Sequence, residues 1–196
     1  LVGGACGGTI TRTYRVTDDC GNTAECQQTI TVNDTTNPLI GCPPGTSAQC
    51  VSVLPAAATT VAEFIALGGS ASDNCDTSLT LTHTDGALVG GACGGTITRT
   101  YRVTDDCGNT KDCTQTITVD DTLDPEISCP TIAPVQCTSD VPAPYADLAA
   151  FIAAGRTASD NCDQNLGFQL VSNNTSGSCP ATVTRVYPLT DDCGYT

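Results

Sequence analysis

Three segments in the middle of the chain alternate apolar and polar residues with a period of two. They run over residues 79–83, 96–103 and 114–119, and Thr occupies many of the polar positions. Such alternation predicts β-strands that are buried on one side only. Arg99 interrupts the apolar face, and we expect its guanidinium to reach solvent at a sheet edge. The apolar face itself comprises Leu79, Leu81, Ile97, Tyr101, Val103, Ile117 and Val119.

One short stretch in each copy of this pattern has helical character instead. Residues 61–67 follow Thr60, and Glu63 comes three residues after Thr60, which is the spacing of a capping box. Gly68 then ends the stretch, as glycine commonly does at a helix C-terminus. The sequence therefore predicts a short helix here. The equivalent features downstream are a helix over residues 148–154, its cap Asp147 and its terminating Gly155.

The chain repeats itself with a period of 87 residues. Residues 1–23 recur without a change as residues 88–110. This period is too long for a solenoid unit but fits a small β-sandwich module in a tandem array. We predict the last strands of one module in residues 1–36, a complete module in residues 37–122, and a third module without its last strand in residues 123–196.

Composition and charge limit the classes of protein that this chain can represent. Its 196 residues include 14 Cys and 1 His, with 7 Lys and Arg against 21 Asp and Glu, for a net charge of −14. The acidity argues against nucleic acid as a partner, and no apolar run approaches the roughly 18 residues of a membrane helix. So many cysteines indicate disulfides in an oxidising compartment. Zinc is disfavoured, because no C-x2-C pair occurs and His83 is alone.

Three motifs carry a resemblance to a known family. They are T-Y-R-V-T-D-D-C-G-N-T at residues 100–110 with C-x-Q-T-I-T-V at 113–119, D-x-x-x-P-x-I-x-C-P at 121–130, and A-S-D-N-C at 71–75 and 158–162. Together they resemble the hyalin-repeat (HYR-like) variant of the immunoglobulin-like fold. That variant occurs in tandem in very large cell-surface adhesins of Bacteroidota.

The resemblance implies a fold and a cellular setting. We expect an all-β chain of tandem immunoglobulin-like β-sandwich modules, stapled by disulfides, with one short helix each. Proteins of this kind are exported by the type IX system and act in adhesion or gliding, so the expected location is the bacterial cell surface. The third copy departs from the pattern, because Pro188 replaces Arg102 and Tyr195 replaces Asn109.

Six cysteines per period allow 15 pairings. In a sandwich of this type, Cys75 at the start of strand C and Cys107 at the end of strand F lie close together, so this is the first pairing expected. Local pairing, with Cys107–Cys113 and Cys42–Cys50, remains the alternative. The long-range set adds Cys42 with Cys113 at one pole and Cys50 with Cys93 at the other, and in the third module Cys162 with Cys193 and Cys137 with Cys179.

Acidic residues gather in the linkers and in two loops of each module. In a tandem sandwich these segments lie at the same pole, where their oxygens suit Ca²⁺, which takes six to eight oxygen ligands. We therefore predict calcium at the module junctions, and turn chemistry or solubility is the alternative explanation. The candidate ligands are Asn33, Asp34, Asp73, Asp76, Asp105 and Asp106, with Asp120, Asp121, Asp160, Asp163, Asp191 and Asp192 at the next junction.

The linkers also contain Asp-Thr pairs that resemble the O-glycosylation motif of Bacteroidota, which makes Thr35 and Thr122 candidate sugar sites.

Catalytic residues are not expected, because His83 does not recur and the Asp pairs lie in turns, so we predict that the chain is not an enzyme.

The predicted function is a rigid spacer in the stalk of a large secreted surface adhesin, or in an extracellular filament. Its expected partners are neighbouring modules of the same chain, identical chains in a filament, and a surface glycan at a distal tip. Nucleic acid and membrane insertion are not expected. The alternatives are a glycan-binding adhesive module and the subunit of a self-assembling filament.

Overall fold

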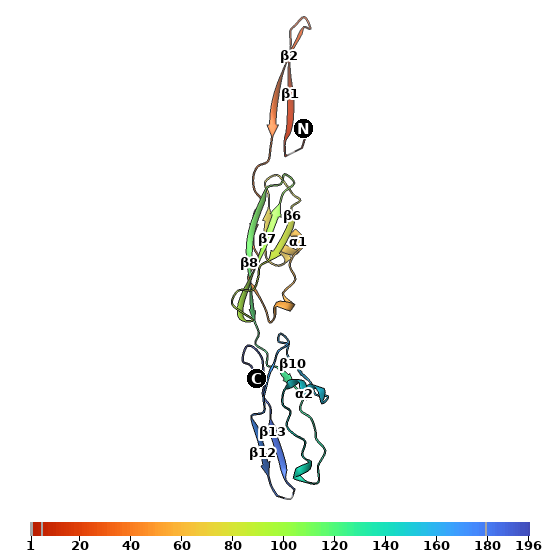
Figure 1. Cartoon of the computed structure of the whole chain (residues 1–196). Coiled ribbons are helices and arrows are strands. Elements are labelled where there is room, and N and C mark those ends of the chain that lie inside the picture. The colour runs from red at the N-terminus through yellow and green to blue at the C-terminus, as the bar shows by residue number, and fades with distance from the viewer. Residues whose placement is uncertain (1, 5, 179) are drawn as a thin grey trace. The chain divides into compact units, whose positions relative to one another are not determined.

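The computed structural model describes all residues except 1, 5 and 179 (Figure 1). It is mostly β with several small sheets and short helices, which confirms the predicted all-β class. The strands are β1 (Gly8–Thr17), β2 (Thr23–Val32), β3 (Leu39–Gly41), β4 (Thr46–Ala48), β5 (Ser70–Ser72), β6 (Thr80–Asp85), β7 (Cys93–Thr104), β8 (Thr110–Asp120), β9 (Glu126–Ile127), β10 (Ala158–Ser159), β11 (Gly167–Phe168), β12 (Ser172–Ser176), β13 (Thr182–Val186) and β14 (Leu189–Thr190). The helices are α1 (Val61–Ala66), α2 (Leu148–Ala153) and two 3₁₀ turns, Val51–Val53 and Thr138–Asp140. No helix among the described residues is long and apolar enough to cross a membrane.

The chain divides into two compact units. The first comprises Leu1–Thr46, Ala56–Ala87 and Ile97–Ile117, and the second comprises Ser47–Pro55, Leu88–Thr96 and Thr118–Thr196. The largest sheet has the strand order β4-β8-β7-β6, and the other sheets contain two strands each: β1-β2, β3-β5, β9-β10, β11-β14 and β12-β13. The module borders expected from the repeat stay a prediction.

The core of the first unit forms where β6 and β7 meet α1. Phe64 of α1 packs edge-on against Tyr101 of β7 at a ring distance of 4.9 Å, and both side chains are fully buried. The Tyr101 hydroxyl accepts a hydrogen bond of 3.2 Å from the backbone N–H of Ala58. Of the seven apolar residues predicted on one face, six are buried and Leu79, just before β6, is half-buried.

Arg99 does not reach solvent, so this expectation is wrong. It lies opposite Asp85 in the β6–β7 pairing and is only 3% exposed. Its Nε and Nη2 donate to the two carboxylate oxygens of Asp85 at 2.6 and 2.8 Å. This two-pronged ion pair gives the guanidinium a partner inside the protein.

Both predicted helices are present. Thr60 and Glu63 form the capping box at the start of α1, and the Asp147 side chain accepts a hydrogen bond from the backbone N–H of Ala150 in α2. Phe151 is the buried residue of α2, as Phe64 is of α1.

The second unit repeats the tyrosine core of the first. The hydroxyl of Tyr187 accepts a hydrogen bond of 3.1 Å from the backbone N–H of Tyr145, which is the equivalent of Ala58. Phe168 stacks on Tyr187 at 5.1 Å and contacts Phe151 at the same ring distance. The same tyrosine-centred core therefore recurs where the local sequence has changed.

Candidate metal sites and inter-repeat disulfides

The described residues form four disulfides, three of which join successive repeats. These three are Cys6–Cys107, Cys50–Cys162 and Cys93–Cys193, with sequence separations of 101, 112 and 100 residues. The fourth, Cys42–Cys113, lies within one repeat, as expected.

The first-choice pairing of Cys75 with Cys107 is wrong, because Cys107 bonds Cys6 of the preceding repeat and Cys75 forms no disulfide. The pairing of Cys50 with Cys93 and that of Cys162 with Cys193 are also wrong, since each of these cysteines bonds another repeat. The local alternatives do not occur either. Cys137 forms no disulfide, and its expected partner Cys179 lies outside the described residues.

The repeat offset explains the arrangement. Cys6 and Cys93 are equivalent, as are Cys107 and Cys193, so Cys6–Cys107 and Cys93–Cys193 are two copies of one inter-repeat bond. The predicted pairings joined cysteines of the same module only, so they left out Cys6, which belongs to the preceding repeat. The identity of residues 1–23 and 88–110 was the available signal, because it shows that a Cys93-type cysteine precedes the complete module.

Five cysteines of the described residues form no disulfide, and they follow the same repeat offset. Each is equivalent by the repeat offset to a cysteine that does form a disulfide: Cys20 to Cys107, Cys26 to Cys113, Cys75 to Cys162, Cys129 to Cys42, and Cys137 to Cys50. They are exposed. Each of them therefore stands at a position of the repeat where the equivalent cysteine is disulfide-bonded.

Four carboxylates converge in the first unit. Asp34 follows β2, Asp73 and Asp76 lie in the loop after β5, and Asp105 begins the turn after β7. Each offers an oxygen that lies within 4.8 Å of the others. Backbone N–H groups position two of them. An Asp73 oxygen accepts from the backbone N–H of Cys75 at 2.8 Å, which is an Asx-turn, and an Asp76 oxygen accepts from the backbone N–H of Asp106, 30 residues away, at 2.7 Å.

The second unit contains the equivalent cluster. Asp121, Asp163 and Asp191 offer oxygens that lie within 4.8 Å of one another. An oxygen of Asp160 also lies within 4.8 Å of an oxygen of Asp121. The local contacts recur too, because an Asp163 oxygen accepts from the backbone N–H of Asp192 at 2.6 Å. Both clusters are thus able to hold a metal ion such as Ca²⁺.

Several of these carboxylates have an oxygen that is buried and makes no hydrogen bond. The residues concerned are Asp34 and Asp73 in the first unit and Asp121, Asp160 and Asp191 in the second. Asp34 is 8% exposed, Asp121 1% and Asp191 6%. Leaving a buried charged acceptor unpaired is costly, which makes these oxygens natural ligands for a cation.

One residue that contacts the clusters differs between the two units. Asn109 donates from its side chain to the Asp105 Oδ2 at 2.9 Å in the first unit. Tyr195 stands at the equivalent place in the second unit and donates only its backbone N–H to Asp191, so the Asp191 Oδ2 has no partner there. The departure of the third copy from the motif thus frees a carboxylate oxygen.

Hydrogen bonding favours the ionised form of two of these carboxyls, Asp105 and Asp160. Burial opposes ionisation of Asp105, but donors on Asn109 and the backbone of Cys107 outweigh it and lower the pKa of Asp105. The pKa of Asp160 is likewise lowered, because backbone N–H groups of Asp163 and Cys162 outweigh burial. Burial and the Asp34 charge raise the pKa of the Cys75 thiol, which disfavours the thiolate that a zinc site needs.

Four predicted metal ligands lie outside the clusters of the structure. Asn33, Asp106, Asp120 and Asp192 are exposed, and the three aspartates belong to no group of converging acidic ligands among the described residues. The candidate sugar sites Thr35 and Thr122 are exposed as well, and the Thr122 hydroxyl lies 3.2 Å from the side-chain nitrogen of Gln49.

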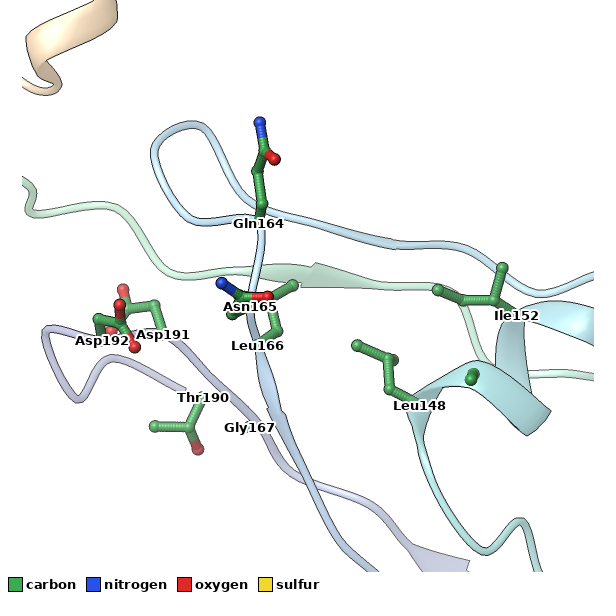
Figure 2. A pocket seen from close by; sticks show the side chains of 10 residues that line it. Leu148, Ile152, Gln164, Asn165, Leu166, Gly167, Thr190, Asp191 and Asp192 are labelled. Atoms are coloured by element: carbon green, nitrogen blue, oxygen red, sulfur yellow. The ribbon is translucent and has the colours of Figure 1, made fainter.

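An open hollow of about 600 Å³ lies beside the second cluster (Figure 2). Figure 2 shows Leu148 and Ile152 of α2 on one side of it, and Asp191 and Asp192 on the turn at the other side. No aromatic side chain lines it. Its lining residues are Leu148, Ala149, Ile152, Gln164, Asn165, Leu166, Gly167, Thr190, Asp191 and Asp192.

Comparison with known families matches one stretch of the chain. A family model described as an HYR-like domain with 4 cysteines matches residues 49–119. No curated protein and no solved structure matches the chain. The chain therefore contains an HYR-like domain, a kind of module typical of extracellular adhesion-type proteins. This domain and the multiple disulfides indicate a secreted, extracellular protein.

Proposed function

We propose that this chain is a covalently tied spacer in the stalk of a large secreted surface adhesin, of the kind that Bacteroidota export by the type IX system, and that it has no catalytic role. The observation that carries the proposal is the recurring inter-repeat disulfide, Cys6–Cys107 and then Cys93–Cys193. A spacer needs length and resistance to tension, and a bond that recurs with the repeat supplies both along the chain.

The disulfides overlap in sequence, which matters for tension. A pull between Cys6 and Cys193 passes through Cys6–Cys107, back along residues 93–107, and through Cys93–Cys193. Most of that stretch belongs to β7, Cys93–Thr104, which is already extended. The load path is therefore about 50 Å of nearly inextensible strand. Without disulfides, the 187 residues between the two cysteines could extend to about 650 Å.

The unbonded cysteines support an array longer than two bonds. Cys75 occupies the Cys162 position and Cys137 the Cys50 position, so each would bond the complementary cysteine of a further repeat of this kind. Neighbouring repeats would in this way extend the same load path.

Single-molecule stretching of the full oxidised chain, held at its two ends, tests the proposal. We expect almost no length gain between Cys6 and Cys193 before rupture, and a release of several hundred ångströms with reductant. The matched variant Cys93→Ser/Cys193→Ser moves the load to Cys42–Cys113 and Cys50–Cys162, where the shortest path has 45 residues (107–113, 42–50 and 162–193). It should extend to about 160 Å. Extension of the oxidised wild-type chain by several hundred ångströms would refute the covalent spacer.

A second candidate, self-assembly into a filament, has one observation in its favour. The first hairpin leaves Ile10, Tyr14 and Val16 of β1 at 36%, 51% and 70% exposure, and a partner chain would cover this face. Electron micrographs would show ordered fibres for a filament and thin separate threads for a stalk. A glycan-binding role has less support, because the hollow in Figure 2 lacks the aromatic platform that sugars stack on.

We also propose Ca²⁺ at the module junctions, where it would stiffen the linkers that follow β2 and β8. Four like charges in one cluster repel one another, and a cation removes that repulsion. Small-angle scattering of the oxidised chain with millimolar calcium and then with chelator tests this role. A shorter maximum dimension and broader conformations in chelator are expected, and superimposable curves would rule out calcium stiffening.

A further inference from the structure

We infer that the chain binds two Ca²⁺ ions, one in each unit, through four carboxylates at equivalent positions of the repeat. The site of the first unit is Asp34, Asp73, Asp76 and Asp105, and that of the second is Asp121, Asp160, Asp163 and Asp191. This inference rests on the calcium role proposed above, and it specifies the ligands and the number of ions.

Recurrence separates these clusters from ordinary surface acidity. Each member of the first site has its counterpart in the second at an offset of 87 residues, or of 86 for Asp105 and Asp191. The surrounding sequence does not simply repeat: Asn109 becomes Tyr195, and Thr77 becomes Gln164. The carboxylates nevertheless come together both times: all four converge in the first site, while in the second Asp121 converges with Asp163 and Asp191 and separately with Asp160. Equivalent backbone N–H donors hold Asp73 and Asp160.

Buried oxygens without partners give an independent indication of a ligand. Asp34 and Asp121 are equivalent residues, both more than nine-tenths buried, and the same oxygen, Oδ2, is unpartnered in each. Asp191 adds a third such oxygen in the second site. A buried carboxylate oxygen next to three other carboxylates is unfavourable twice, by desolvation and by repulsion, and a bound divalent cation relieves both.

The donor set selects calcium among common cations. All ligand atoms are carboxylate oxygens, which are hard donors suited to Ca²⁺ and Mg²⁺. The nearby Cys107 and Cys162 are held in disulfides and supply no thiolate for zinc. Mg²⁺ usually keeps several waters and uses one or two carboxylates, whereas Ca²⁺ accommodates four carboxylates with irregular geometry.

Isothermal titration of the oxidised full chain with CaCl₂, after removal of metal by chelator, measures the number of sites. We expect two ions per chain. Asp34→Asn and Asp121→Asn, which preserve side-chain shape, should each remove one ion or weaken it by at least about tenfold, and the double variant should lose both. Circular dichroism confirms that each variant folds; if either does not, the less buried Asp73→Asn and Asp160→Asn replace them.

Matched controls come from exposed neighbours in the same segments. Asp106→Asn and Asp120→Asn change the charge equally, next to Asp105 and Asp121, but should leave both sites intact because these side chains are exposed. Three results would overturn the inference. They are no calcium binding to the wild-type chain, unchanged binding in Asp34→Asn and Asp121→Asn, and an equal loss of binding in the controls. Two-site binding without any change in scattering would instead uphold the sites and refute only calcium stiffening, and the stretching experiment tests the covalent spacer separately.

Discussion

Residues 1–23 and 88–110 have the same sequence but different environments. Tyr14 is 51% exposed whereas its copy Tyr101 is fully buried, and Val16 is 70% exposed whereas Val103 is fully buried. Both copies form antiparallel strands, β1 and β7. The difference lies in what covers them: β7 lies between β6 and β8 and packs on α1, while β1 pairs with β2 in a sheet of two strands.

The comparison shows that strand formation and burial have separate causes here. Alternation of apolar and β-branched residues is enough for an extended strand in both copies. Stability depends on neighbours that come from other parts of the chain, and two-stranded hairpins are marginal by themselves. Matched substitutions at equivalent positions of the two copies therefore measure what those neighbours contribute.

The largest difference is expected at the core tyrosine. Tyr101→Ala removes the ring that packs on Phe64 and leaves the backbone N–H of Ala58 without its acceptor, so unfolding should become easier by about 3–5 kcal/mol. The matched Tyr14→Ala should change the unfolding free energy by less than about 0.5 kcal/mol. Denaturant unfolding followed by circular dichroism makes the measurement. Equal effects would show that the β1 hairpin is buried in solution.

A smaller but still large difference is expected for the disulfide within the repeat. Cys42→Ser/Cys113→Ser should lower the unfolding free energy by about 2–5 kcal/mol, because the bond restricts the unfolded chain. The control Cys26→Ser/Cys129→Ser changes the equivalent cysteines, which form no disulfide here, and should be nearly neutral. A destabilised control would mean that these two cysteines also form a stabilising contact.

The smallest difference concerns the arginine of the same strand. Arg99→Ala breaks the buried pair with Asp85 and should cost about 1–3 kcal/mol at neutral pH, while the equivalent Arg12→Ala, on the exposed β1, should be nearly neutral. Hydrogen bonding from Arg99 lowers the pKa of Asp85. This stabilisation is therefore complete above the ordinary Asp pKa and is lost as the pH falls below about 4.

Unfolding curves of wild type and Arg99→Ala between pH 7 and pH 2 check the sign of this effect. The gap between the two proteins should narrow as Asp85 takes up its proton. A gap that widens on acidification would contradict the role assigned to the pair.

Local sequence by itself determined the three central strands β6, β7 and β8, the two short helices and the acidic segments. Thr60 with Glu63 was sufficient for α1, since a capping box acts within one turn, and alternation was sufficient for β6, β7 and β8. All eight carboxylates of the two candidate sites are among the twelve metal ligands predicted from the acidic linkers and loops of the repeat. The repeat did not separate Asp34 from Asn33 or Asp105 from Asp106, because adjacent residues share the same composition signal.

Tertiary structure alone decided which of those carboxylates converge, which cysteines pair and which copy of an identical segment is buried. Cys107 bonds Cys6 rather than Cys75 because the preceding repeat, distant in sequence, brings its own cysteine within reach. Arg99 is buried because Asp85 lies opposite it in the strand register. These outcomes depend on segments far apart in the chain, and residues 1–23 and 88–110, being identical, cannot encode their own difference.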